Sequence, residues 1–363
     1  MQNTKEVHAP FLHSVRVFGQ KFVFRQVLGK GSYGVVCRMK NAEGHEIAAK
    51  ITMNLDANMQ ISNYRETVVL SQLHHPNIIG YLGAYNLKTH GGARCAVILM
   101  EYAAGGSLGS RIRRGPISEE EARCFFGQMT LGVAHMHSKN IVHGDLKPEN
   151  IIICGELLKI ADFGLARHIE HVQGAEKRAR DMGTLIFNSP QKCLGPSLGT
   201  KDDVWALGIM LFVMLLKSYP WREATPNDPE FVKWSRGAPS VFRRFPSDVQ
   251  EAFHLSLRVD EAKRAPARVL LKVGYCRHFM PVTRSEPAIK DHLQQLNLVD
   301  YFSQMARSPA RVSRSRKRLI PAVPFQQYGA LPIPLGPHPF DAQAHMAPKR
   351  VCRSPPRLPQ MIS

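Results

Sequence analysis

The sequence predicts an α+β fold in two parts, because its pattern changes near residue 106. Before that point, alternating and β-branched stretches separated by turn residues predict antiparallel strands with one helix among them. After it, apolar residues recur at helical spacing. One stretch, 202–216, is apolar nearly all round, as in a helix buried in a core. The 363 residues, 44% of them hydrophobic, suffice for one large or two modest domains.

The first hundred residues carry one amphipathic stretch among the strands. A helix is predicted at 63–74, where Tyr64, Val68, Leu70 and Leu73 recur at helical spacing. The segment NAEG forms a turn between two of the strands. The predicted strands are 21–28, 35–40, 45–53, 74–85 and 95–102.

The second part opens with a helix start signal. Ser118 and Glu121 form an S-x-x-E capping box, which predicts a helix through Met136. Another amphipathic stretch at 288–305 has apolar residues at helical spacing. From about residue 307 the chain is basic and rich in proline, which predicts disorder with local polyproline II.

Composition narrows the function classes. The sequence has no run of eighteen apolar residues and no apolar leader, so we expect neither a membrane span nor a secretory signal. Seven cysteines without paired spacing argue against a disulfide scaffold or a zinc site, and a reducing intracellular compartment is the simplest interpretation. The net charge of +19 attracts anions, but nucleotide-handling enzymes and basic tails share this property, so nucleic-acid binding is not favoured.

A glycine-rich loop, GKGSYGVV, places Gly29, Gly31 and Gly34 in a G-x-G-x-x-G pattern. Glycines let the backbone approach phosphate oxygens and donate N–H groups to them. A dinucleotide-binding fold would need a helix after the glycines, whereas a β-branched strand and a tight turn follow here. A hairpin folded over a nucleotide fits better, with a merely flexible turn as the alternative.

Charged residues also stand among apolar ones. Lys50 lies in the strand segment IAAK, and a buried lysine needs an anion, which Glu66 on the following helix and nucleotide phosphates can offer. Asp145 and Asp162 lie in Ile- and Leu-rich segments, where a buried carboxylate costs several kcal/mol unless a cation meets it. For each residue taken singly, a solvated surface charge is the alternative.

Together these residues resemble a eukaryotic protein kinase of the Ser/Thr class. The resemblance covers about residues 22–282. It is carried by the glycine loop, the lysine, the helix glutamate and the segments HGDLKPEN, DFG, GT-x-x-F-x-SPQ and DVWALG, in the order and spacing of the family. The segment WREATPNDPEFVKWSRG and the Pro-rich tail are most similar to the SH3-binding-domain kinase group.

The resemblance implies a bilobal protein kinase fold with a β-rich N-lobe and a mainly helical C-lobe. It places an N-terminal extension at 1–20 and the kinase domain at 21–282. The domain divides into the N-lobe (21–100), the hinge (101–106) and the C-lobe (107–282). An amphipathic helical extension (283–306) and a disordered basic Pro-rich tail (307–363) follow.

The resemblance also implies catalytic roles, with ATP and Mg²⁺ as cofactors. Asp162 and Asn150 would bind magnesium. Asp145 would accept the hydrogen bond of the substrate hydroxyl, and Lys147 would neutralise the γ-phosphate. Lys50 would bind phosphates and pair with Glu66.

The resemblance also implies which residues contact the nucleotide and which pack between the lobes. The nucleotide would lie against Leu28, Gly29, Gly31, Gly34, Val36, Ala48, Lys50, Met100, Glu101, Ala103 and Ile152, with Met100 before the hinge and Glu101 and Ala103 offering backbone groups to the adenine. Leu70, Tyr81, His143 and Phe163 would form a column between the lobes, Asp203 would anchor its base, and Gln191 would bind Arg264 in place of the family's Glu–Arg pair.

One departure concerns regulation. Most regulated kinases have an arginine before the catalytic aspartate, which pairs with a phosphate on the activation loop, whereas this chain has Gly144. The loop 165–182 contains no Ser, Thr or Tyr. We therefore expect an ATP-dependent Ser/Thr protein kinase that is active without activation-loop phosphorylation; an inactive, degenerate kinase is the alternative.

The expected partners are protein substrates with Ser or Thr. Segments 318–324 and 353–359 both match R-x-x-P-x-x-P, the form that SH3 grooves bind. A pseudokinase scaffold that recruits SH3 proteins through these segments, or a small-molecule phosphotransferase on the same fold, would be the other classes. Cytoplasmic location is expected, and RSRKRL makes the nucleus an alternative.

Overall fold

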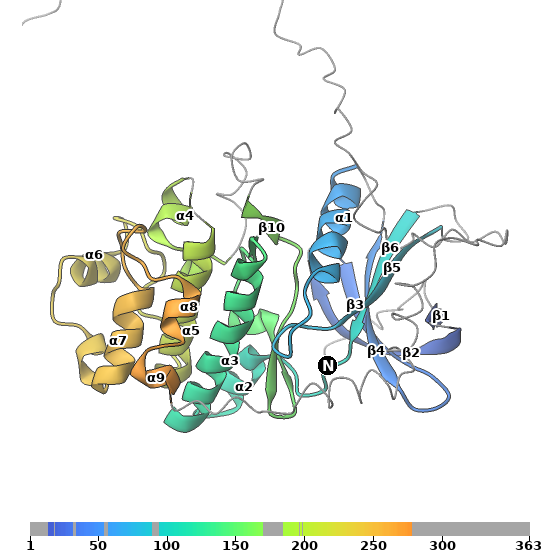
Figure 1. The fold of residues 1–363 in the computed structure, drawn as a ribbon, viewed down its shortest axis with the longest axis horizontal. Helices are drawn as coiled ribbons and strands as arrows, with labels where there is room; N and C mark the ends of the chain where they lie inside the picture. The colour runs from blue at the N-terminus through green and yellow to red at the C-terminus, as the bar shows by residue number, and fades with distance from the viewer. Residues whose placement is uncertain are drawn as a thin grey trace, which may run out of the picture. The chain divides into compact units, whose positions relative to one another are not determined.

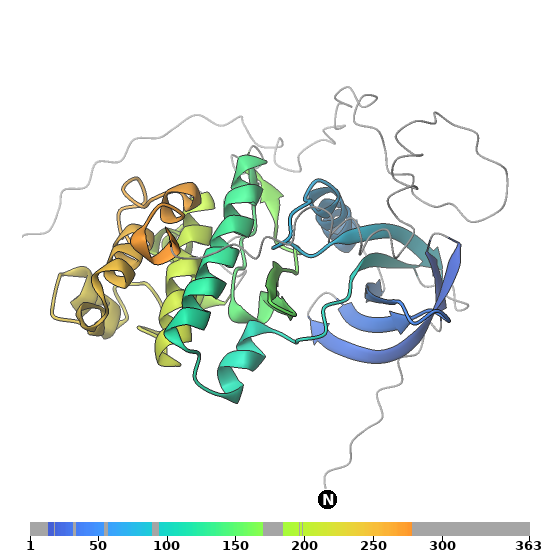
Figure 2. The same ribbon diagram turned by 60° about the horizontal axis from the view of Figure 1, so that its bottom comes forward.

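The computed structural model describes residues 14–17, 19–31, 34–53, 57–88, 94–169, 184–195, 197 and 199–277. The helix predicted at 288–305, the tail predicted to be disordered and both SH3-type segments lie outside these residues. Within them, a β-sheet half and a helical half follow each other along the chain, as the sequence predicts (Figures 1 and 2). The predicted division into a β-rich part and a mainly helical part is thereby confirmed.

The N-terminal half is one six-stranded sheet with the strand order β1-β2-β3-β4-β6-β5. Its neighbouring strands are all antiparallel, and helix α1 (Ala57–Ser71) lies beside it (Figure 1). The strands are β1 (Ser14–Val17), β2 (Gln20–Gly31), β3 (Gly34–Lys40), β4 (Glu46–Met53), β5 (Tyr81–Lys88) and β6 (Arg94–Glu101).

Strand β1 adds an edge that the sequence analysis missed, since it lies in the predicted N-terminal extension. Its segment SVRV alternates, with Val15 and Val17 buried and Arg16 exposed. Val17 pairs with Gln20 across a tight turn. Four residues give too short a period to distinguish such a strand from a loop by sequence alone.

The helical half is built around two long helices, α3 (Glu119–Ser138) and α5 (Thr200–Leu216). Every residue of α5 from Asp202 to Met214 is buried, as the all-round apolar pattern predicts. The other helices are α2 (Leu108–Arg114), α4 (Pro190–Leu194), α6 (Pro229–Ser235), α7 (Ser247–Ser256), α8 (Ala267–Leu270) and α9 (Gly274–Arg277). The short strands are β7 (Ile141–Val142), β8 (Ile151–Cys154), β9 (Leu157–Ile160) and β10 (Arg167–His168).

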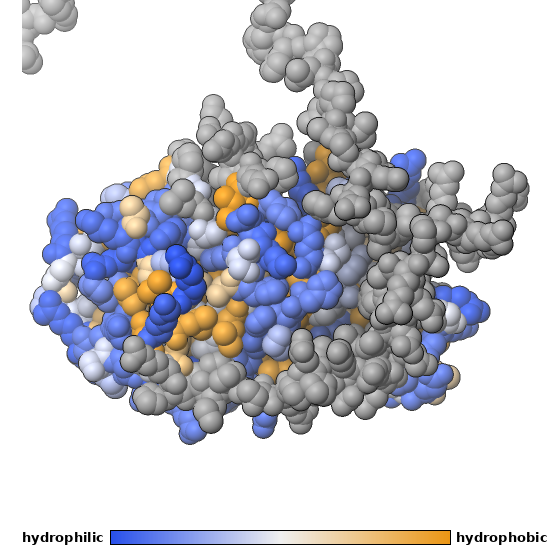
Figure 3. All heavy atoms as spheres, viewed as in Figure 1, coloured by the Kyte–Doolittle hydropathy of each residue, from blue (hydrophilic) through white to orange (hydrophobic). Residues whose placement is uncertain are grey.

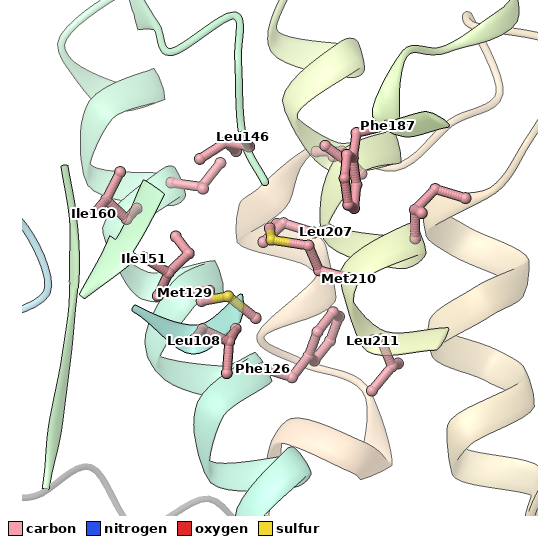
Figure 4. Packing of buried hydrophobic residues seen from close by; sticks show 14 of the residues in the cluster. Leu108, Phe126, Met129, Leu146, Ile151, Ile160, Phe187, Leu207, Met210 and Leu211 are labelled. Atoms are coloured by element: carbon pink, nitrogen blue, oxygen red, sulfur yellow. The ribbon is translucent and has the colours of Figure 1, made fainter. Parts of the chain in front are cut away.

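The core of this half lies between α3 and α5. Phe126 and Met129 of α3 pack in one cluster with Leu207, Met210 and Leu211 of α5 (Figure 4). Apolar residues also reach the surface of the helical half, among hydrophilic ones (Figure 3). None of the helices that the structure describes is both long and apolar enough to cross a membrane.

Helix α3 begins where the capping signal predicts. The Ser118 hydroxyl accepts a hydrogen bond from the Glu121 amide at 3.1 Å. The Glu121 carboxylate does not complete a reciprocal box, because it accepts hydrogen bonds from Arg111 at 2.9 and 2.6 Å. The same glutamate thus ties α2 to the start of α3.

Two local expectations differ from the structure. Strand β5 begins at Tyr81 rather than at 74, because Ile79 donates its amide to the carbonyl of Ile160 in the helical half. Helix α1 begins at Ala57, before the predicted residue 63, and Tyr64 is 66% exposed instead of lying on the buried face. Leu70 and Leu73 are buried as predicted.

The glycine loop offers a test of backbone geometry. Gly34 has φ +150°, and an added Cβ would lie 2.3 Å from the Ile51 carbonyl oxygen. Gly34→Ala should therefore lower the free energy of unfolding by about 2 kcal/mol in urea titrations without nucleotide. Gly29 has no atom within 4 Å of that position, so Gly29→Ala is the control and should change stability by less than about 0.5 kcal/mol. Equal stability of the two variants would contradict this account.

Candidate active site

A buried lysine joins three segments of the chain. Lys50 of β4 donates from Nζ to both carboxylate oxygens of Glu66 on α1, at 2.7 and 2.8 Å. The same ammonium donates to Oδ1 of Asp162, in the loop after β9, at 2.9 Å. Burial opposes the charge, but the two carboxylates outweigh it and hold the pKa of Lys50 above its usual value. The predicted pairing of Lys50 with Glu66 is present in the structure.

Asp162 is held in an uncommon backbone conformation. Its φ is +60°, a value that residues other than glycine rarely adopt. Residues in such conformations cluster at functional sites. Although burial acts in the opposite direction, Lys50 lowers the pKa of Asp162 below its usual value. The lowered pKa keeps the carboxylate charged, and because the Asp162 side chain is 50% exposed, a ligand can reach it.

Asp145 lies among polar partners after β7. Lys147 donates from Nζ to Oδ2 of Asp145 at 2.6 Å. The Asn150 amide nitrogen donates to the Asp145 carbonyl oxygen at 2.8 Å, and the Thr184 amide lies 3.4 Å from Oδ1 of Asp145. A carboxylate, an ammonium and an amide are thus brought together within one short loop.

The donor set suits a hard divalent cation. Asp162 offers a carboxylate oxygen and Asn150 an amide oxygen, the kinds of ligand that Mg²⁺ prefers. Within the described part of the chain, no three His, Cys, Asp or Glu residues group into a metal site of their own. Magnesium is commonly held by one or two side chains together with substrate phosphates, and these two residues fit that arrangement.

The sheet brings the predicted nucleotide contacts into register. Gly29 lies opposite Val36, and Val36 lies opposite Lys50. Ala48 lies opposite Met100, and both belong to the buried cluster against which Val36 packs. The remaining predicted contacts lie on β2 and β3 (Leu28, Gly31, Gly34), on β8 (Ile152) and where β6 ends (Ala103).

The Glu101 side chain fixes the segment after Met100. The Glu101 carboxylate forms an ion pair with Lys159 at 3.0 Å and accepts a hydrogen bond from the Gly80 amide at 3.1 Å. Lys159 is buried on β9, and its role is not evident from the sequence. These contacts join the predicted hinge to both halves of the fold.

Asp203, at the start of α5, organises the loop before Asp145. Its carboxylate accepts hydrogen bonds from the amides of His143 and Gly144 at 2.9 and 3.0 Å, and His137 Nε2 lies 2.9 Å away. Burial would raise the pKa of Asp203, but the contact with His137 and the amide hydrogen bonds hold it below its usual value.

Two predicted packing relations are also present. The rings of His143 and Phe163 lie 5.1 Å apart, and both residues and Leu70 are fully buried. Arg264 donates to the Gln191 side-chain oxygen at 2.7 Å, as predicted. Gln191 uses its amide nitrogen as well, donating to the Val259 carbonyl at 2.6 Å, which a glutamate could not do.

The sequence of this chain is similar to those of known proteins. The family model for the protein kinase domain matches residues 22–276. Serine/threonine-protein kinase SAPK4 of Oryza sativa subsp. japonica is 33% identical over 274 residues, covering 74% of this chain and 71% of that protein. Serine/threonine-protein kinase SRK2H of Arabidopsis thaliana is 34% identical over 274 residues, covering 72% and 73%.

The buried aspartate makes a prediction about acid stability. Because its pKa is lowered in the folded state, Asp203 stabilises the fold above about pH 4 and loses this contribution as pH falls through the folded pKa. Asp203→Asn should lower the free energy of unfolding by about 2 kcal/mol at pH 7, and the difference should shrink in acid. Glu156→Gln, at an exposed position between β8 and β9, is the control and should change the free energy of unfolding by less than about 0.5 kcal/mol. A difference that stayed constant down to pH 2 would contradict the assignment.

Proposed function

This chain belongs to the protein kinase family, and we propose that the residues around Lys50 and Asp145 transfer the γ-phosphoryl group of Mg·ATP to protein hydroxyls. The chain is a protein serine/threonine kinase, as its family match and its similarity to proteins of that name establish. Protein kinases generally use ATP and Mg²⁺.

The observation that carries the residue assignment is the sharing of one ammonium between two carboxylates. Lys50 contacts Glu66 and Asp162 at once, so strand β4, helix α1 and the loop after β9 are held together. Phosphoryl transfer depends on positioning and on charges placed in advance. The contact with Glu66 fixes the Lys50 ammonium, which is then oriented towards phosphate oxygens.

The roles of the other residues follow from their contacts. Asp145 accepts the hydrogen bond of the attacking hydroxyl and orients it, while Lys147, 2.6 Å from Asp145, neutralises charge that develops on the γ-phosphate. Asn150 and Asp162 would hold Mg²⁺, which neutralises charge on the β- and γ-phosphates when it is bound.

The glycine loop and the paired strands supply the nucleotide contacts. Gly29, Gly31 and Gly34 offer backbone amides to phosphates, and the register of Val36, Ala48 and Met100 supports an apolar site for the adenine. Backbone groups of Glu101 and Ala103 bind the adenine edge, with Leu28 and Ile152 completing the contacts.

Gly144 supports activity without activation-loop phosphorylation. Its φ of +78° favours glycine, and an added Cβ would lie 3.2 Å from the Leu165 carbonyl oxygen and 3.3 Å from Arg167 Nη1. An arginine at this position would be strained and crowded by Arg167. Most of the loop between Leu165 and Thr184 lies outside the described residues, and its lack of Ser, Thr and Tyr is a property of the sequence.

The alternative of a pseudokinase scaffold is not favoured, because Lys50, Asp145 and Asp162 are all present. The SH3-type segments at 318–324 and 353–359 lie outside the described residues, so SH3 binding stays a prediction. The same holds for the cytoplasmic or nuclear location.

Lys50→Met and Asp162→Asn test the residue assignment. Each removes a charge that would act on the phosphates, so each should lower kcat/KM at least about 100-fold in a phosphate-transfer assay while the domain stays folded by circular dichroism. Lys40→Met removes a more exposed lysine from the same sheet and should leave kcat/KM unchanged. Full activity of either site variant would refute its role.

Phosphatase treatment tests the independence from activation-loop phosphorylation. Protein made in bacteria and treated with phosphatase should retain its kcat, because the loop 165–182 carries no hydroxyl to phosphorylate. Mass spectrometry verifies that phosphate is absent, and the Lys50→Met variant controls for contaminating kinases. Loss of all activity after treatment would contradict the proposal.

A further inference from the structure

A second buried lysine lies directly beneath the catalytic loop. Lys192 is on α4, outside the residues assigned so far, and only 7% of its surface is exposed. Its Nζ donates to the Gly144 carbonyl oxygen at 2.5 Å. Gly144 is the residue before Asp145, so this contact reaches the backbone that carries the proposed acceptor of the substrate hydroxyl.

The charge on Lys192 is balanced through space. Burial lowers the pKa of Lys192, and the carboxylates of Asp202, Asp203 and Asp145 act against that shift. These four residues and Gly144 line a cavity of about 10 Å³, room for about one water molecule. A buried ammonium without such carboxylates would be strongly unfavourable.

Asp202 is itself fixed in place at the start of α5. The hydroxyls of Ser189 and Ser197 both donate to its carboxylate. Ser189 also caps α4, where it accepts a hydrogen bond from the Lys192 amide at 3.1 Å. The carboxylate and the ammonium therefore lie on two elements that are bonded to each other, which fixes their relative position.

Gly144 is consequently held from both sides. Its amide donates to Asp203 at 3.0 Å, and its carbonyl accepts from Lys192. Glycine has more backbone freedom than any other residue, so a loop with glycine at this point loses more entropy on ordering. Two buried charges restrain the peptide groups on either side of it, immediately before Asp145.

We propose that Lys192 is a positioning residue for phosphoryl transfer, and that its hydrogen bond to Gly144 orders the catalytic loop in place of a phosphate on the activation loop. The inference rests on the proposed function, since it assumes that Asp145 acts on the substrate hydroxyl. It also gives a role to the buried residues Lys192 and Asp202, which are not among the predicted catalytic residues.

The first variant is Lys192→Met in the full chain, treated with phosphatase. Methionine keeps the length of the side chain and loses the donor and the charge. We expect kcat to fall about 10- to 100-fold. The KM for ATP should change less than about twofold, since the predicted nucleotide contacts lie elsewhere.

The melting temperature of Lys192→Met should stay within about 3 °C of the wild-type value, because removing a buried charge offsets the lost hydrogen bond. Lys233→Met, an exposed lysine on α6, is the matched control and should leave all three values unchanged.

The second variant, Asp202→Asn, keeps the shape and removes the charge opposite Lys192. It should lower kcat in the same direction, and the double variant should be no worse than Lys192→Met alone, because both changes act through one contact. If Lys192→Met does not fold, the kcat of Asp202→Asn decides alone.

Unchanged kcat in the folded variants, or losses that simply add in the double variant, would overturn the positioning role. If the wild-type protein is still active after phosphatase treatment, the proposed function holds even when the positioning role of Lys192 is refuted. Wild-type protein that is inactive after treatment would instead refute the phosphate-independent activity on which the inference rests.

Discussion

The geometry of this candidate active site depends on one buried ammonium group. Lys50 satisfies the carboxylates of Glu66 and Asp162, and they satisfy it, at distances of 2.7 to 2.9 Å. Without the lysine, the two carboxylates would lie close together with no cation between them, and their repulsion would favour separation. Lys50 of strand β4 therefore fixes helix α1 relative to the loop after β9, while the apolar cores are formed by other residues. We propose that the same contact orients the ammonium towards phosphate oxygens.

Buried charged groups also fix the loop around Asp145 in the helical half. Buried groups on α4 and α5 bind both peptide groups of Gly144, and the long helix α5 is fixed by its apolar packing against α3. These contacts support the proposal that the core of the domain, and not an added phosphate, positions Asp145. In this view Gly144 is compatible with activity because the surrounding structure supplies the order that the glycine itself lacks.

The sequence predicts those parts of the site in which the residue type restricts the partner. A lysine in an apolar strand needs a carboxylate, so the Lys50–Glu66 contact could be predicted from the residue types. The Arg264–Gln191 contact could be predicted only from the resemblance to protein kinases, in which a Glu–Arg pair stands at these positions. The start of β5 depends on a contact between distant segments, which local patterns do not encode. Strand β1 pairs with the adjacent β2, but its four residues are too few to show a strand pattern. The exposure of Tyr64 depends on how α1 lies in the fold and not on the spacing of its apolar residues. Lys192 could have been noticed as a charge in the segment PQKCL, but only the fold shows that it meets Gly144.

The most direct test of the central claim is transfer of labelled phosphate from the γ-position of ATP by the purified, phosphatase-treated full chain, with and without magnesium. A generic basic protein or a peptide array serves as the acceptor, followed by analysis of the phosphorylated amino acid. The account predicts magnesium-dependent labelling of serine or threonine at a rate that the Lys50→Met variant does not reach. Equal labelling by that variant, or no label on any protein acceptor, would contradict it.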